Sequence, residues 1–141
     1  IVLGYKTSVA GAISAGNDGV TLDNEAVAGS SINASKGVTT GYRSRVAGDI
    51  TAGDDVSIGQ EATVGGAVSV SGSRDVIVGY AATVSGNISS ANGRVSLGQT
   101  AVVGACVQVA NAGRTITLDY QARATYALTP KNRRVLALIC S

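Results

Sequence analysis

The sequence contains no histidine, tryptophan, methionine or phenylalanine, and its only aromatic residues are five tyrosines. Without an imidazole the chain has no histidine base, no Ser-His pair and no histidine-ligated metal. Its two cysteines, Cys106 and Cys140, are too few for a zinc site. We therefore expect no catalytic residues, no metal and no cofactor, and the chain is not expected to be an enzyme.

Proline occurs once, and no run of apolar residues approaches the roughly 18 that a membrane-spanning helix needs. The proline content and the glycine spacing exclude a collagen-like chain, and the positive mean hydropathy excludes a disordered one. The sequence is instead rich in Ala, Val, Ser and Thr. A core built from such small side chains favours a narrow, layered fold over an ordinary globule.

A segment of fifteen residues repeats seven times without a gap, and spacers of three to six residues join the copies. The copies are residues 1–15, 20–34, 38–52, 56–70, 76–90, 95–109 and 116–130. Apolar or small residues at positions one and three, seven and nine, and thirteen and fifteen alternate with outward ones. This period of two is typical of short strands with one buried face. Glycine or aspartate at position four predicts a corner with unusual backbone dihedral angles.

Three short strands per copy predict an all-β, single-domain fold over residues 1–141, a triangular parallel β-solenoid (β-helix). Seven coils of about 18–21 residues are followed by a short tail. The coils are 1–19, 20–37, 38–55, 56–75, 76–94, 95–115 and 116–135, and the tail is 136–141. Crossovers between parallel strands are usually right-handed, so we expect a right-handed solenoid.

Two columns of outward residues run along the first corner of the predicted coils. Tyrosines at position five alternate with amides from copy to copy, and position six carries alternating charges in the first four copies. The tyrosines are Tyr5, Tyr42, Tyr80 and Tyr120, and the charges are Lys6, Glu25, Arg43 and Glu61. Either these ladders fix the register of the stack, or the tyrosines bind a sugar or another filament. Position two is a column of mostly Ser and Thr, which fits a solvated face or an ice-binding one.

Both ends of the sequence carry hydrophobic residues, at inward positions of the repeat or directly beside them. These residues are Ile1, Val2, Leu3, Leu136, Leu138 and Ile139. An open coil edge leaves backbone groups unpaired, and a solenoid that stays single normally carries polar capping repeats. Residues 1–113 contain six basic and eight acidic residues and carry a charge of −2. Residues 114–141 contain five basic residues and one acidic residue and carry a charge of +4. We therefore expect head-to-tail contacts that build a homopolymer. Irregular residues in the seventh copy, Thr125, Tyr126 and Pro130, are the one indication of a cap.

The two cysteines leave two alternatives open. On a regular coil path Cys106 and Cys140 occupy outward positions on different faces, beyond the ~7 Å between Cα atoms that a disulfide spans. Either the tail folds back and a disulfide pins it, or both thiols are free. The even cysteine count and low lysine content favour an extracellular or cell-surface chain; the alternative is a cytoplasmic, cytoskeletal protein. Because the sequence starts at Ile1 without Met, we expect a processed chain or an excised segment.

Several stretches resemble the coils of bactofilins, which are polymer-forming β-helical proteins that assemble without a nucleotide. These stretches are residues 48–59 (GDITAGDDVSIG), 84–89 (VSGNIS) and 95–98 (VSLG). The coils are also similar to Ala/Gly/Ser-rich solenoid stretches of bacterial surface and pilus-associated proteins. Residues 97–108 resemble the six-residue pattern of hexapeptide-repeat acyltransferases, but that activity relies on a histidine base, which this chain lacks.

The repeat, the hydrophobic ends and the resemblance together predict a structural, self-assembling subunit of a filament or surface fibre. Its expected partners are further copies of itself, with a glycan or surface contact as a second kind. The alternative function is an extracellular binding module for ice or glycan that presents flat Ser/Thr and Tyr ladders. No nucleic-acid partner is expected, because the net charge is only +2 and aromatic residues are few.

Overall fold

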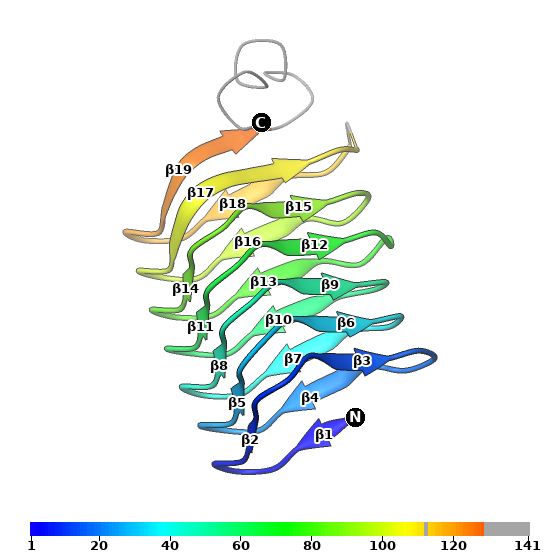
Figure 1. The fold of residues 1–141 in the computed structure, drawn as a ribbon. Coiled ribbons are helices and arrows are strands. Elements are labelled where there is room, and N and C mark those ends of the chain that lie inside the picture. The colour runs from blue at the N-terminus through cyan, green and yellow to red at the C-terminus, as the bar shows by residue number, and fades with distance from the viewer. Residues whose placement is uncertain (112, 129–141) are drawn as a thin grey trace.

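The structure is a computed structural model that describes residues 1–111 and 113–128, with side chains as far as Thr125. Its regular secondary structure consists of nineteen β-strands, and the described residues contain no helix. The strands pair in parallel and stack as coils along one axis (Figure 1). The predicted single-domain β-solenoid is therefore confirmed. It has six complete coils, and a seventh contributes its strands up to residue 128.

The first side of every coil belongs to one seven-stranded parallel sheet. Its strands are β1 (Val2–Leu3), β4 (Val20–Leu22), β7 (Val38–Thr40), β10 (Val56–Ile58), β13 (Val76–Val78), β16 (Val95–Leu97) and β18 (Ile116–Leu118). Neighbours pair position for position, for example Val56 with both Val38 and Val76. Unequal spacers therefore leave the register of this sheet unchanged.

The second and third sides join into a twelve-stranded sheet. The second side is β2 (Ser8–Val9), β5 (Val27–Ala28), β8 (Arg45–Val46), β11 (Thr63–Val64) and β14 (Thr83–Val84). The third is β3 (Ile13–Ala15), β6 (Ile32–Ala34), β9 (Ile50–Ala52), β12 (Val68–Val70) and β15 (Ile88–Ser90). In the sixth coil one long strand, β17 (Val102–Val109), spans both sides, and β19 (Arg123–Leu128) pairs with it.

The gap-free alignment of the repeat fails at one place in the seventh copy. Val103 pairs with Ala124 as the repeat predicts, but the next pair is Cys106 with Tyr126. Two residues on β17 thus oppose a single residue, Thr125, on β19, which is the geometry of a β-bulge. Beyond it the pairing is displaced by one residue, and Leu128 lies beside Gln108 at position fourteen instead of thirteen.

The core is a stack of small apolar layers. Inward positions hold Val, Ile, Leu and Ala side chains that are almost completely buried from the second coil to the sixth. Three polar residues are buried with them, and each makes a hydrogen bond to the backbone. Ser44 Oγ donates to the Gly41 carbonyl, whereas Thr40 Oγ1 and Ser90 Oγ accept from the Gly59 and Gly93 amides. The layers therefore bury polar atoms without leaving them unsatisfied.

The first corner differs from the prediction that glycine at position four supplies an unusual backbone angle. No glycine has a positive φ; the residues at position six do, with φ between 52° and 58°. These residues are Lys6, Glu25, Arg43, Glu61, Ala81, Thr100 and Gln121. The position-seven amide donates to the position-four carbonyl, as Ala62 does to Gly59 at 3.2 Å, which closes a turn of the type that needs positive φ at its third residue.

Glycine at position four serves close approach between coils instead. A Cβ on Gly59 would collide with the carbonyl oxygens of Thr40 and Gly41 in the coil below. A Cβ on Gly4, which has no described coil below it, would meet only a Thr7 methyl group at 3.9 Å. The requirement for glycine at Gly59 is thus imposed by the neighbouring coil, whereas position four accepts an aspartate at Asp23 and Asp119.

Candidate functional site

The edge of the first coil exposes core positions that are buried in every following complete coil. Val9 is 36% exposed, whereas Val46, at the same inward position two coils further on, is 1% exposed. Ile1 is also exposed, and Leu3 and Ile13 retain slightly more exposure than their counterparts Leu22 and Ile32. The described residues place nothing beneath this edge, so an apolar layer stays partly open there.

The same edge presents backbone donors in the pattern that joins one coil to the next. In the second coil the amides of Asp23, Val27 and Gly29 donate to carbonyls of the first coil at 2.7–2.8 Å. The corresponding amides of the first coil belong to Gly4, Ser8 and Ala10, and no described coil lies below them to accept. A row of free donors above an apolar layer is a template for a further parallel strand.

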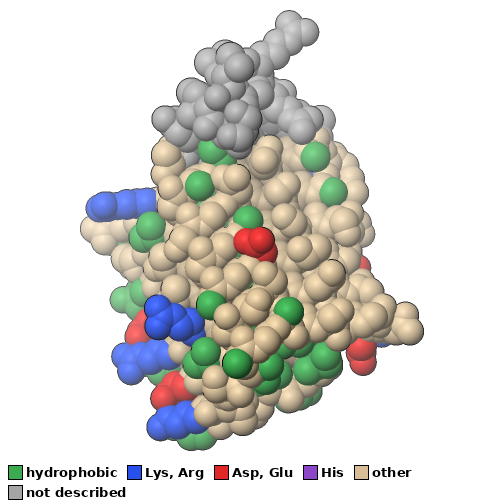
Figure 2. All heavy atoms as spheres, viewed as in Figure 1, with side chains coloured by type: hydrophobic (Ala, Val, Ile, Leu, Met, Phe, Trp, Pro, Cys, Tyr) green, Lys and Arg blue, Asp and Glu red, His purple; other side chains and the backbone are tan. Residues whose placement is uncertain are grey.

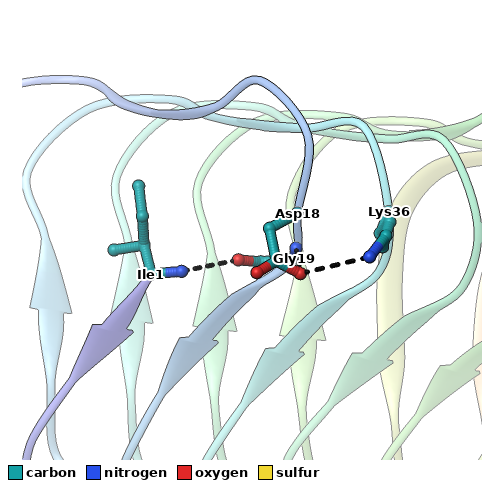
Figure 3. A network of polar contacts seen from close by, with 4 residues as sticks. All are labelled: Ile1, Asp18, Gly19 and Lys36. Carbon is teal, nitrogen blue, oxygen red and sulfur yellow. Dashed lines mark hydrogen bonds and ion pairs between the residues drawn. The ribbon is translucent and has the colours of Figure 1, made fainter.

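A small polar network ties this edge to the second coil (Figure 3). The Ile1 amine donates to the Gly19 carbonyl at 2.8 Å, the same bond that the Val20 amide makes to Gly37. Asp18 accepts from the Gly19 amide at 2.9 Å and lies 3.6 Å from the Lys36 ammonium. The Gly19 amide, and then the Lys36 charge, hold the pKa of Asp18 below its usual value. The edge is therefore held in strand geometry without a coil beneath it.

The interface residues predicted from the sequence fall in different places. Ile1 and Leu3 lie on the open edge, but Val2 occupies position two and is exposed on the outer side of the solenoid. Leu136, Leu138 and Ile139, together with Pro130, lie outside the described residues. Val9 was not among the predicted residues. The signal that could have identified it is its inward position nine in the first of the seven copies.

The charged ladder at the first corner forms pairs between coils, as its alternating signs predict. Lys6 Nζ lies 3.6 Å from Glu25, and Arg43 Nε lies 2.7 Å from Glu61. Each cation also lies over the tyrosine that precedes it, 5.0 Å from the Tyr5 ring centre and 4.8 Å from that of Tyr42. The Tyr5 hydroxyl and the Glu25 carboxylate hold the pKa of Lys6 above its usual value.

The corner changes character in the fifth to seventh coils. Position six there is Ala81, Thr100 and Gln121, so no cation follows Tyr80 or Tyr120 in the sequence, whereas Asp119 directly precedes Tyr120. Figure 2 shows Lys/Arg and Asp/Glu alternating along the lower left edge, with hydrophobic and uncharged side chains directly above and a Lys/Arg side chain further up the same edge. Exposed hydrophobic residues flank this upper part on both sides, namely Ile77 on β13 and Val102 on β17.

The position-two column is flat but not uniform. Thr21, Thr39 and Thr117 are exposed and Ser57 and Ser96 are half-buried on the outer side of the seven-stranded sheet. The exposed Ile77 interrupts the column, as the sequence indicates. One hydroxyl per coil is too sparse an array to favour ice binding over a solvated face.

Cys106, which was expected to face outward, is 3% exposed but does not belong to the hydrophobic core cluster that contains Val103 and Val107. Its amide donates to Asn87 Oδ1 at 3.0 Å. Cys106 is disulfide-bonded, whereas Cys140 lies outside the described residues. The pairing of these two cysteines therefore stays a prediction.

Within residues 1–111 and 113–128, no group of three or more His, Cys, Asp or Glu residues could hold a metal ion. The same part of the chain has no helix long and apolar enough to cross a membrane. Comparison with known proteins gives no match to a family model, to a curated protein or to a solved structure.

Proposed function

We propose that the chain is a structural, self-assembling β-solenoid subunit that stacks head to tail into a filament or surface fibre. The observation that carries the proposal is the open edge of the first coil. It combines free backbone donors at Gly4, Ser8 and Ala10 with the half-exposed Val9. A strand added to such an edge gains main-chain hydrogen bonds, and its side chains cover the open apolar layer.

The seventh coil offers strands in the matching register over two sides. β18 pairs with β16 position for position, and so does Ala124 with Val103. Leu118 is exposed and occupies position three, the same position as Leu3 on the open edge. Only beyond the bulge does the register depart from the repeat. The matching register therefore supports docking of the seventh coil of one subunit beneath β1 and β2 in the first coil of the next subunit.

The charge distribution favours contact between unlike ends. Residues 1–113 carry −2 and residues 114–141 carry +4. A contact between different surfaces of identical subunits does not close upon itself, so repetition builds a fibre. The disulfide bond of Cys106 suits an oxidising setting, which favours an extracellular or cell-surface fibre over a cytoplasmic one.

The test compares two valines of nearly equal exposure. Val9 lies on the open edge at 36% exposure, whereas Val102 faces outward from β17 at 38%. In Val9→Lys, a charge on the edge should abolish long polymers, because docking would bury it without a partner. Val102→Lys should polymerise like the wild type. Electron microscopy and light scattering of the purified 141-residue chain measure polymer length.

The double variant Ile1→Lys with Leu3→Lys is expected to act like Val9→Lys and to keep the β-rich circular dichroism spectrum of the central coils. A wild-type chain that stays monomeric at high concentration would contradict the proposal. Equal polymer lengths for Val9→Lys and Val102→Lys would contradict the assignment of the open edge as the interface.

A further inference from the structure

The uncharged part of the first corner is a second surface, distinct from the open edge. Its position-five residues are Tyr80, Gln99 and Tyr120, all exposed, with tyrosine exposures of 46% and 65%. No cation lies over either tyrosine ring among the described residues. Tyr5 and Tyr42, in contrast, each have one ring face covered by Lys6 or Arg43. The upper corner therefore presents aromatic rings that no charge covers.

The backbone places these three residues in one column at an even spacing. The residues that follow them, Ala81, Thr100 and Gln121, share φ values of 53°, 57° and 56°. The Ala81 amide donates to the Gln99 carbonyl at 3.0 Å, and the Thr100 amide donates to the Tyr120 carbonyl at 2.9 Å. Successive corners thus repeat at the spacing of paired strands. Two coils place Tyr80 and Tyr120 about 10 Å apart with Gln99 between them.

We propose that the row Tyr80–Gln99–Tyr120 binds an extended β-1,4-linked glycan. In such a chain each sugar is turned by half a revolution relative to the last, so the same face recurs at every second sugar. This recurrence is close to the height of two coils, which lets both rings stack on equivalent sugar faces. The Gln99 amide offers a donor and an acceptor to the hydroxyl groups of the sugar between them.

The chemistry and size of the row favour a neutral polysaccharide over a protein. The row and its position-six neighbours carry no charge, and the adjacent Asp119 carboxylate accepts from the Tyr120 amide. A row without cations suits a ligand that has hydroxyl groups and no anionic groups. Tyr pairs an apolar ring with a polar hydroxyl, as sugars pair C–H faces with hydroxyl rims. A ridge one side chain wide is far smaller than the roughly 800 Å² per partner of a standard protein interface.

The test is a depletion assay with the full chain on microcrystalline cellulose and on chitin, which share the β-1,4 linkage. An α-linked glucan, starch granules, is the specificity control. The variant Tyr80→Ala with Tyr120→Ala should lower the binding constant by roughly tenfold or more. Tyr5→Ala removes an exposed tyrosine of the same column from the charged half and should bind like the wild type.

All variants are compared by circular dichroism and thermal unfolding, and Gln99→Ala provides a milder disruption of the row. Binding to cellulose alone or to chitin alone identifies the sugar and supports the proposal. Absence of binding to both, equal binding to starch, or undiminished binding by the double variant and by Gln99→Ala would overturn it. Binding of the chain to cellulose, chitin and starch alike, unchanged by the tyrosine substitutions, would also overturn the proposal and would indicate nonspecific adsorption. The assay is repeated with Val9→Lys, so that the result does not depend on polymerisation.

Discussion

At the scale of single residues, the most demanding positions are the position-six residues at the first corner. Lys6, Glu25, Arg43, Glu61, Ala81, Thr100 and Gln121 hold a left-handed backbone conformation. That conformation costs a residue with a Cβ roughly 1–2 kcal/mol, and a β-branched residue such as Thr100 tolerates it least. Bonds on both sides hold the corner in place, since the Thr100 amide donates to Tyr120 and the Ala101 amide donates to Gly98.

Thr100→Asn is expected to raise the free energy of unfolding by about 1 kcal/mol, because asparagine adopts positive φ more readily than a β-branched residue. The comparison is Thr63→Asn in β11, where strand geometry favours the β-branched residue and stability should fall. Urea denaturation of both variants measures the difference. A loss of stability in Thr100→Asn would show that the corner is not strained at this residue.

At the scale of strands and corners, the requirement for small residues comes from the coil below and not from the local turn. Gly59 lies directly against the Thr40 and Gly41 carbonyls. Gly4 occupies the same position of the repeat with open space beneath it. The two glycines therefore separate the cost of a tight turn from the cost of close packing between coils.

Gly59→Ala is expected to lower the free energy of unfolding by about 1–3 kcal/mol, because the new methyl group forces two coils apart. Gly4→Ala should change the stability of the isolated subunit by less than about 1 kcal/mol. Thermal and chemical unfolding of both variants, measured at concentrations where the chain is monomeric, provide the comparison. Equal losses would mean that position four is needed for backbone freedom after all.

Most strands could be predicted from the sequence, because position-by-position alternation records burial directly. Val56, Ser57 and Ile58 alternate inward and outward as any half-buried strand does. The left-handed residues were missed, since Lys, Glu, Arg, Ala and Thr carry no signal for positive φ. The shift in pairing between β17 and β19 was also missed, because a bulge leaves no mark in the composition.

The candidate site could be predicted only in outline. The exposure of the first coil edge followed from the repeat, which places Ile1 and Leu3 at inward positions of that coil. Val2 was assigned to the same edge although position two faces outward. Val9 was not predicted, because the exposure of an inward residue depends on the layers around it and not on its own sequence context.

At the scale of the whole molecule, the solenoid behaves as a stack in which each coil contacts only its neighbours. β10 pairs with β7 on one side and with β13 on the other, and all three keep the same register. Because the register is shared, any inner coil could be replaced by the next one. The fold thus specifies a repeat and does not require a fixed number of coils.

Deletion of residues 56–75, one whole coil, should leave a folded β-solenoid of lower stability. Joining Asp55 to Val76 brings Val76 beside Val38, which are both partners of Val56 in the intact chain. Deletion of residues 61–70 removes half a coil and should prevent folding, because every later side chain would meet the wrong position. Circular dichroism and hydrogen exchange distinguish the two results. A folded half-coil deletion would contradict a register-determined stack.

The direction of the backbone hydrogen bonds has a mechanical consequence. Bonds such as Asp23 to Leu3 and Gly41 to Leu22 join one coil to the next and therefore run along the long axis. Tension along a fibre of these subunits would load every layer in series, pulling the bonds open instead of shearing them. The layer with the fewest bonds then yields first. In the proposed fibre that layer is the junction between subunits, where the bulge leaves one side out of register, so an overstretched fibre would part into whole subunits able to rejoin.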